Sequence, residues 1–352
     1  MNDRIPIIIS ILLILVVSLS AQDKPYRIGT TAANFLEMGI GGAGNAMGEA
    51  YVSVVNDISS VYWNPAGLAY IQNNEALFMH QPWIAGIDVN FAGAGFSFPS
   101  LGTFAFAITN MNYGRTEVTT MLMQDGTGET YEADEYAFMF SYGRKIVQWF
   151  AFGATAKYVT SRIWHMSAGA AALDLGVTID TQFFSPTGRK ENGLRIGMSI
   201  SNYGTRMKYD GIDLLQPIDI LPDENGNYEY VEGEYRLQGW ELPLIFRIGT
   251  SLTPLVTETQ KLTLAIDALH PNNNSESVNV GGEYQYSFTG LGKLMLWGGY
   301  RGLFMEENPY GVTMGVGLQV DLVHNSKIKI GYAYKNMEIL TNSSIYTLAV
   351  TF

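Results

Sequence analysis

Side chains that could do chemistry are few and scattered in this chain of 352 residues. It has no cysteine, which excludes disulfides, thiolate metal sites and cysteine nucleophiles. Four histidines lie on separate segments without metal-ligand spacing: His80, His165, His270 and His324. No serine lies in a nucleophile turn. We therefore expect no catalytic residue, no metal, no cofactor and no enzyme activity.

Two short sequence strings partly match known ligand-binding motifs. Residues 39–44, Gly-Ile-Gly-Gly-Ala-Gly, match the glycine spacing of a dinucleotide loop but lack the preceding buried strand and the parallel unit around it. Residues 223–227, Asp-Glu-Asn-Gly-Asn, alternate oxygen ligands as calcium loops do, without the correctly placed glycine or the late glutamate. Close backbone packing explains the glycines better, and a solvated acidic loop explains the second string better.

Composition points to a membrane protein that crosses the bilayer with strands. Only 15% of the residues are charged, against about 25% in typical soluble domains, while glycine (38) and tyrosine (21) are abundant. Beyond residue 21 no stretch approaches the ~18 continuous apolar residues of a spanning helix. The net charge of -12 argues against nucleic acid as a partner. These features fit an outer-membrane β-barrel with an apolar outer band and aromatic girdles.

The N-terminus predicts export. Arg4 precedes an apolar run from Ile5 to Leu19, and small residues follow, with cleavage expected after Ser20 or Ala21. The run is shorter than the ~20 apolar residues that span a bilayer. No cysteine follows it, so the chain is not a lipoprotein. We assign residues 1–21 to a cleaved signal peptide and expect the protein in the bacterial outer membrane.

From Glu75 onward the chain alternates between apolar and small or polar residues, in segments separated by turn residues. We expect strands at 75–83, 87–98, 102–113, 135–143, 150–163, 169–184, 193–203, 242–252, 260–269, 277–287, 293–302, 311–322, 327–335 and 344–352. The number, fourteen, is even, as bacterial barrels require. The fold class is therefore all-β, with an antiparallel transmembrane barrel over residues 75–352.

Connection lengths and strand faces fit this barrel. Both long gaps, 114–134 and 204–241, follow odd-numbered strands, so both are expected on the outer side of the membrane. In the strand at 311–322, apolar residues share one face, which we assign to lipid. The opposite faces of this strand and the next should meet a wet lumen, through Asp321, Lys327, Lys329 and Lys335.

The last strand is expected to close the barrel. Tyr346, Leu348, Val350 and Phe352 share one face of an alternating segment, which would be an aggregation-prone edge if left unpaired. The segment resembles the closing strand of bacterial outer-membrane barrels, whose terminal aromatic residue is read by the insertion machinery. We expect it to pair with 75–83, and Phe352 to serve barrel assembly.

Residues 22–74, here called the plug segment, do not alternate. They are rich in glycine, including Gly39, Gly41, Gly42, Gly44 and Gly48. Fourteen strands enclose more space than barrel side chains fill, so we expect this segment to occupy the lumen. Pro65 biases the residue before it away from the helical region, which predicts a turn at Asn64, Pro65, Ala66 and Gly67.

That turn carries a family resemblance. Asn-Pro-Ala-Gly ahead of the first strand looks like the hatch of FadL-type outer-membrane transporters, which are fourteen-stranded barrels plugged by their N-terminus. The longer strings at 39–52 and 63–69 resemble the PorV/PorQ branch of that superfamily more closely. Further strings support the branch: 241–244, 246–249, 267–274, 279–284 and 298–301. One departure is Gly44-Asn45, where the family often has a basic residue.

The PorV resemblance implies a component of type IX secretion that receives and shuttles secreted cargo. Its partners would then be translocon and cargo proteins, besides outer-membrane lipid. The 204–241 loop interleaves acids with aromatic residues, as protein interfaces do. The alternative is a FadL-like passive channel for a hydrophobic small molecule, with the plug segment as its gate. A barrel with no transport duty is a third reading.

Overall fold

The computed structural model describes residues 27–352 except 225, 227–229, 306–307, 323–325 and 338–341. The expected signal peptide therefore lies outside the described residues. Within the described residues, no helix combines the length and the apolar character needed to cross a bilayer.

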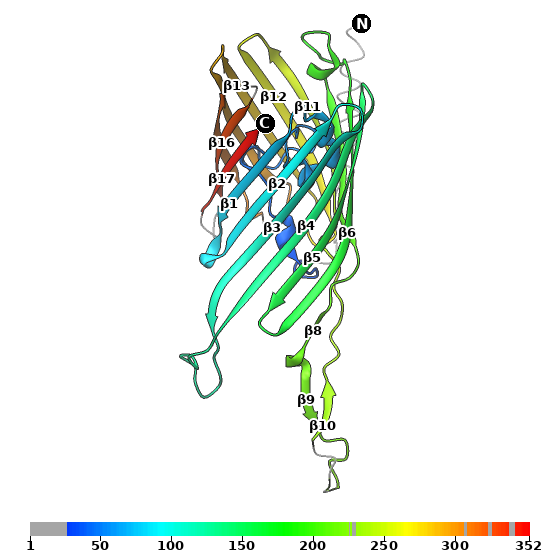
Figure 1. Cartoon of the computed structure of the whole chain (residues 1–352), viewed down its shortest axis with the longest axis vertical. Coiled ribbons are helices and arrows are strands. Elements are labelled where there is room, and N and C mark those ends of the chain that lie inside the picture. Colours follow the sequence, from blue (N-terminus) through cyan, green and yellow to red (C-terminus); the bar gives the residue numbers. More distant parts are fainter. Residues whose placement is uncertain (1–26, 225, 227–229, 306–307, 323–325, 338–341) are drawn as a thin grey trace.

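Fourteen strands of the described residues close into an antiparallel barrel (Figure 1). Closure is made by β1 and β17, with Glu75 opposite Thr351 and His80 opposite Tyr346. The barrel strands are β1 Glu75–Pro82, β2 Asp88–Phe98, β3 Gly102–Glu117, β4 Thr130–Val147, β5 Phe150–Ile163, β6 Met166–Asp180, β7 Arg195–Gly204, β11 Ile245–Val256, β12 Gln260–Pro271, β13 Ser277–Phe288, β14 Gly292–Leu303, β15 Val312–Asp321, β16 Lys327–Asn336 and β17 Asn342–Thr351. The predicted fold and strand number are confirmed.

The gap expected at 114–134 is wrong in its extent. β3 and β4 resume pairing beyond a bulge after Asn112, where Arg115 lies opposite Glu132 and forms an ion pair with it at 2.6 Å. Only residues 118–129 connect the two strands. Beyond the bulge, β3 pairs only with β4, because β2 last pairs with β3 at Asn112.

The long loop expected at 204–241 contains short strands of its own. β8 (Tyr209–Gly211) pairs with β6, and η5 (Ile212–Leu214) follows it. β9 (Leu215–Ile218) and β10 (Val231–Glu234) then pair only with each other and project beyond the barrel (Figure 1). Gly233 permits this hairpin because a Cβ there would overlap the side chain of Ile218.

The two long connections lie at the same end of the barrel, as predicted (Figure 1). We call this the loop end. The turns between β2 and β3 and between β11 and β12 lie at the other end, together with the end of β17. We call that the turn end. There, the backbone N–H of Phe352 donates to the Asn74 carbonyl at 2.9 Å.

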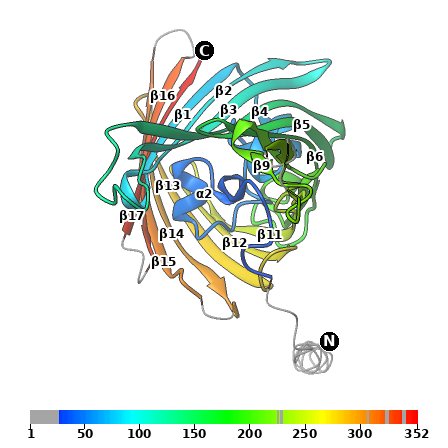
Figure 2. The same ribbon diagram turned by 90° about the horizontal axis from the view of Figure 1, so that it is seen from below.

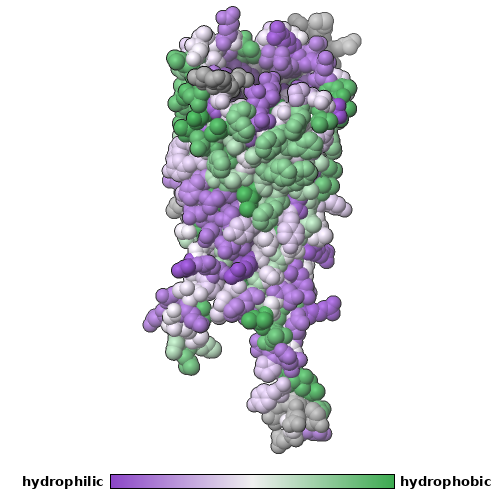
Figure 3. All heavy atoms as spheres, viewed as in Figure 1, coloured by the Kyte–Doolittle hydropathy of each residue, from purple (hydrophilic) through white to green (hydrophobic). Residues whose placement is uncertain are grey.

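Barrel faces follow the alternation of the sequence. Ile330 is 57% exposed, whereas Thr313 and Lys335 are almost fully buried on the inner face. On the side seen in Figure 3, apolar side chains gather on the half of the barrel nearer the turn end, and polar ones predominate toward the loop end. The expected wet lumen is wrong at Lys335, because the plug segment fills the space beside it.

The described part of the plug segment, residues 27–74, lies within the ring of strands (Figure 2). Its short helices are η1 Asn34–Glu37, α2 Gly42–Ala46, α3 Ser60–Trp63 and η2 Pro65–Tyr70. Apolar plug residues form one core with small inward residues of the wall, such as Ala105, Ala137 and Ala333. These small side chains leave the room that the plug segment occupies. Two other short helices, η3 Ile84–Gly86 and η4 Lys190–Asn192, lie in connections.

Candidate functional site

Trp63 is the centre of the plug segment. Its side chain is fully buried, and its indole N–H donates to the Ile40 carbonyl at 2.7 Å. The rings of Tyr62 and Tyr51 meet it edge-on, with centroids at 4.7 and 6.0 Å. Trp63 of α3 thus holds the chain between η1 and α2 against α3.

The glycines singled out in the sequence lie at close approaches. A Cβ on Gly39 would come within 3.0 Å of the Trp63 ring, and one on Gly44 within 2.8 Å. Gly41 has a φ of +85°, which favours glycine, and its N–H donates to Met79 Sδ of β1 at 3.1 Å. These glycines serve packing inside the lumen.

Gly42 opens α2 against the wall. Its N–H donates to Thr347 Oγ1 of β17 at 2.8 Å. Four residues along, Ala46 accepts a hydrogen bond from Thr313 Oγ1 of β15 at 2.8 Å. The helix is therefore held at both ends by threonine hydroxyls of the barrel.

The chain after α2 runs against two glycines of the wall. Gly48, with a φ of +66°, donates its N–H to Thr313 Oγ1 at 2.9 Å. Gly281 of β13 and Gly299 of β14 face each other in register, and a Cβ on either would overlap the backbone of Met47. Plug and wall glycines meet here in backbone-to-backbone contact.

The Asn64–Gly67 turn has a matching seat on the opposite wall. Gly143, Gly153 and Gly176 lie side by side on β4, β5 and β6. A Cβ on Gly153 would overlap the Pro65 carbonyl, and one on Gly176 would overlap the side-chain oxygen of Asn64. The wall is therefore bare of side chains where the turn passes.

Hydrogen bonds lock this turn. Asn64 Nδ2 donates to the Val177 carbonyl of β6 at 3.1 Å, and Asn64 Oδ1 accepts from the Ala66 N–H at 3.1 Å. The Ala66 contact caps η2, which begins at Pro65, where a missing N–H costs nothing. Gly67 packs against the Val55 carbonyl, 2.7 Å from where its Cβ would be.

Near the loop end, charged side chains of the wall bind the plug segment. Glu49 is almost fully buried and accepts from Arg301 of β14 at 2.6 Å and from Lys335 of β16 at 2.9 Å. Lys335 also donates to Asn45 Oδ1 at 2.8 Å. Burial alone would raise the pKa of Glu49, but the two cations outweigh it and lower that pKa below its usual value.

Two wall carboxylates anchor the plug segment elsewhere. Asp267 of β12 is fully buried and accepts from the Val52 N–H at 2.8 Å. Near the turn end, Asp180 of β6 accepts from the Tyr70 hydroxyl at 2.7 Å and pairs with Arg195 at 2.6 Å. The segment is thus attached along its length rather than at one point.

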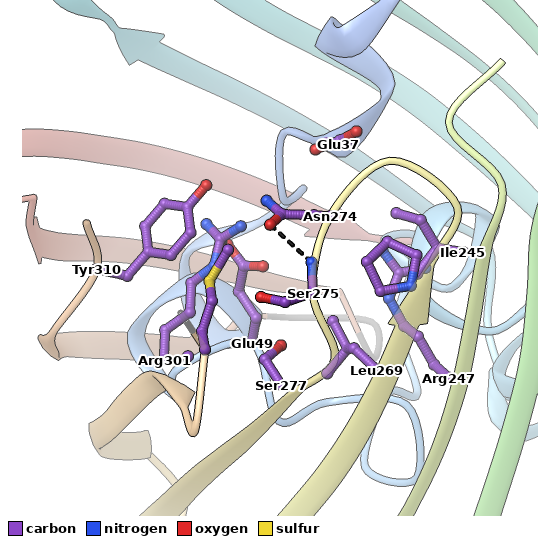
Figure 4. A pocket seen from close by; sticks show the side chains of 13 residues that line it. Glu37, Glu49, Ile245, Arg247, Leu269, Asn274, Ser275, Ser277, Arg301 and Tyr310 are labelled. Carbon is purple, nitrogen blue, oxygen red and sulfur yellow. Dashed lines mark hydrogen bonds and ion pairs between the residues drawn. The ribbon is translucent and has the colours of Figure 1, made fainter. Parts of the chain in front are cut away.

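A cavity of about 50 Å³ remains between the plug segment and β11, β12 and β14. Figure 4 shows Arg301 and Tyr310 on one side, Arg247 on the other, and Glu49 and Ser275 between them. Burial raises the pKa of Glu37, which also lines the cavity. A second cavity of about 10 Å³ lies beside α2 and the ion pair of Asp57 with Lys329.

The charged residues of this interface were not predicted from the sequence. Glu49, Arg247, Asp267 and Arg301 all lie in strings that carried the family resemblance, but none was given a role. The sequence pattern does indicate an inward position for Arg247. It stands between apolar residues in an alternating strand, so its side chain had to face inward.

The described histidines lie apart from one another. Across the described ranges, no group of three or more His, Cys, Asp and Glu side chains could hold a metal ion. His80, His165 and His270 contact Asn90, Asp213 and Glu276 respectively, on separate segments. His324, Asn225 and Asn227 lie outside the described residues.

A closed fourteen-strand barrel with its N-terminal segment seated inside defines the class of plugged outer-membrane barrels. Solved structures share this fold. The Pseudomonas putida toluene transporter TodX matches with a TM-score of 0.54 at 12% identity, over 89% of this chain and 96% of that one. The Ralstonia pickettii toluene transporter TbuX matches at 0.52 and 10%, over 89% and 97%. At such identities the likeness shows the fold alone.

The family is shown by sequence. The family model described as Type IX secretion system protein PorV matches residues 20–222, more than half of the chain. The chain therefore belongs to the PorV family of type IX secretion proteins. No curated protein sequence matches it. The family is one of type IX secretion proteins, and the fold is shared with outer-membrane toluene transporters.

Proposed function

We propose that this barrel receives secreted cargo for a type IX translocon at its extracellular end while its own lumen stays shut. The observation that carries the proposal is the seating of the plug segment. Backbone contacts reach it from glycines on opposite walls, and ion pairs and threonine hydroxyls reach it from β14 to β17. A polypeptide could pass only if all of these contacts broke.

The loop end is the extracellular end in this proposal, because bacterial barrels have short periplasmic turns and longer outer loops. The chain would reach the outer membrane after removal of residues 1–21. The plug segment at 22–74 and the barrel at 75–352 would then be its two parts. Asn64 to Gly67 and the five plug glycines would keep the segment seated.

The projecting hairpin of β9 and β10 is the surface we assign to protein partners. Aromatic residues near it are open to solvent, with Tyr230 82%, Tyr235 62% and Trp240 51% exposed. Glu232 and Glu234 lie among them on β10. Exposed aromatic rings interleaved with acids are suited to a protein interface, where aromatic residues are enriched.

The alternative, a passive channel for hydrophobic small molecules, has less support. The cavities beside the plug segment are about 50 and 10 Å³, and the larger one is lined by two arginines and two glutamates. An engineered cavity that binds benzene is apolar and about 150 Å³. A hydrophobic ligand would therefore need the plug segment to move.

Removal of the hairpin tests the proposal. Replacing residues 215–234 by a short Gly-Ser linker deletes only strands that pair with each other, so the barrel should assemble normally. A matched control shortens the other long connection, at 119–128. Both variants would be purified from native membranes after cross-linking.

We expect translocon and cargo proteins with the wild type and the control, and loss of cargo with the hairpin variant. Copurified lipid without any protein partner would contradict the secretion role. Equal cargo recovery with the hairpin variant would contradict the docking surface.

A further inference from the structure

Arg247 of β11 is a buried guanidinium that lacks a carboxylate partner. The residue is only 2% exposed. NH1 donates to Ser201 Oγ at 3.1 Å and NH2 to the Tyr62 hydroxyl at 3.4 Å, while Nε has no hydrogen-bond partner. Within the part of the chain that the structure describes, no ion pair includes Arg247. Burying an unpaired charge is costly, and the rings of Tyr62 and Trp63, with centroids 5.3 and 5.8 Å from the guanidinium carbon, offset only part of that cost.

The carboxylates around Arg247 are engaged with other groups. Glu49 accepts from Arg301 and Lys335, and Glu37 accepts from Asn273. Asp267 accepts from the backbone of the plug segment through Oδ2, while its Oδ1 has no hydrogen-bond partner. Arg247 therefore keeps donor capacity beside the cavity of about 50 Å³ that it lines.

The cavity also gathers the family strings that lay apart in the sequence. The string at 246–249 supplies Arg247, the one at 267–274 supplies Leu269 and Asn274, and the one at 298–301 supplies Arg301. Ser275 follows directly, and its buried hydroxyl has no hydrogen-bond partner. Two cations and an unpartnered hydroxyl thus border one small space (Figure 4).

We propose that this cavity binds a carboxylate carried on a short aliphatic stem, with Arg247 as its principal partner and Arg301 and Ser275 beside it. A guanidinium presents its N–H groups as a fork that matches the two oxygens of a carboxylate. Ile245, Leu269 and Met305 line the same space and would cover the stem.

Size limits the ligand. A water molecule needs roughly 10–15 Å³ of such space, so about 50 Å³ admits only a few groups of that size. A carboxylate with one or two methylene carbons fits this limit, and a long acyl chain does not. The carboxylate could come from a polypeptide, as an acidic side chain or a chain end, or from a free short-chain acid.

The site does not depend on the proposed secretion role, because a barrel of any function could hold it. Its test is direct titration of the purified full barrel in detergent micelles by calorimetry. Acetate and N-acetylglycine are the carboxylate probes. N-acetylglycine amide and chloride are the matched probes without a carboxylate.

We expect saturable binding of both carboxylates and none of the amide or chloride. Arg247→Met should weaken binding at least about tenfold, because a buried charge-assisted contact is lost. Arg247→Lys keeps the positive charge but loses the paired N–H groups of the guanidinium. Its affinity for the carboxylates should lie between those of the wild type and Arg247→Met. Arg206→Met is the control, since Arg206 lies exposed in an ion pair with Glu241.

Tighter binding of N-acetylglycine than of acetate would assign the site to polypeptide carboxylates, and the reverse order to free short-chain acids; either supports the proposal. Absence of saturable carboxylate binding would overturn it, as would unchanged affinity in Arg247→Met. If Arg247→Met does not fold by circular dichroism, unchanged affinity in Arg247→Lys would overturn it instead. These binding results are independent of the hairpin experiment, which tests the proposed secretion role.

Discussion

Glu49 of the plug segment and Arg301 of β14 form an ion pair at 2.6 Å inside the barrel. They are 252 positions apart in the sequence. Lys335 of β16 completes the group at 2.9 Å. The pair joins the part of the chain that fills the lumen to the part that builds the wall, so its loss should destabilise both parts.

Glu49→Gln should strongly destabilise the protein. The substitution leaves Arg301 and Lys335 buried without a carboxylate, which costs about 3–5 kcal/mol. Glu132→Gln is the control, because its ion pair with Arg115 has the same 2.6 Å distance but is exposed. Solvent screens that exposed pair, so its loss should leave the stability almost unchanged. Urea unfolding in micelles measures both; equal effects would show that the Glu49 pair does not hold the plug segment.

Gly153→Ala should unseat the Pro65 turn. Its Cβ would overlap the Pro65 carbonyl, and overpacking of this kind costs about 1–3 kcal/mol. Gly298→Ala is the matched control, since nothing lies within 4 Å of its added Cβ. Limited proteolysis should cut within residues 53–72 faster in Gly153→Ala only. Protection equal to that of Gly298→Ala would rule out the glycine seat.

Acidification should loosen the plug segment through Glu49. Because its pKa is lowered in the folded state, its contribution is fully present above the unfolded pKa of 4.5 and is lost as the pH falls through the lower folded pKa. Hydrogen exchange of residues 42–52 should therefore speed up between pH ~6 and ~3, after correction for the intrinsic rate. Glu49→Gln should lack this part of the pH dependence. An identical pH profile in the variant would contradict the assignment.

Alternation and turn residues sufficed to predict the barrel. The strand expected at 150–163 is β5 with the same bounds, and the closing pair of β1 and β17 lies where the pattern placed it. The strand ends at the rim of the barrel were harder to predict, because β3, β4 and the β9–β10 hairpin extend beyond the membrane into solvent. Beyond the rim no lipid face enforces alternation, so the residue pattern does not mark where these local hairpins begin and end.

The seat of the plug segment could be predicted only in part. Glycines at 39–48 and the turn at Pro65 signalled close packing, because their backbone chemistry is local. Nothing in the local sequence marks their wall partners, such as Gly176 and Thr347, as contact positions. Only the register of the closed barrel brings these residues to the plug segment. Charged contacts such as Glu49 with Arg301 need the same register.

Deletion of Phe352 should reduce the amount of protein in the outer membrane while leaving export across the inner membrane intact. Its N–H bonds the Asn74 carbonyl, beside the seam between β17 and β1. Fractionation and heat-modified gel mobility measure folded barrel in each membrane. Phe352→Tyr, which keeps an aromatic ring, is the control. Normal outer-membrane levels of the deletion variant would contradict a role for Phe352 in assembly.

A disulfide between the plug segment and the wall would show whether secretion needs the lumen to open. The chain has no cysteine, and a Cβ on Gly42 would lie 3.8 Å from Thr347 Cβ, a separation that suits a disulfide. Gly42→Cys with Thr347→Cys would replace the natural copy, and secretion of type IX cargo would be measured in oxidised and reduced cells. Each single-cysteine variant is a control. The account predicts equal secretion with the plug segment locked or free; loss of secretion only in the oxidised double variant would show that the lumen must open.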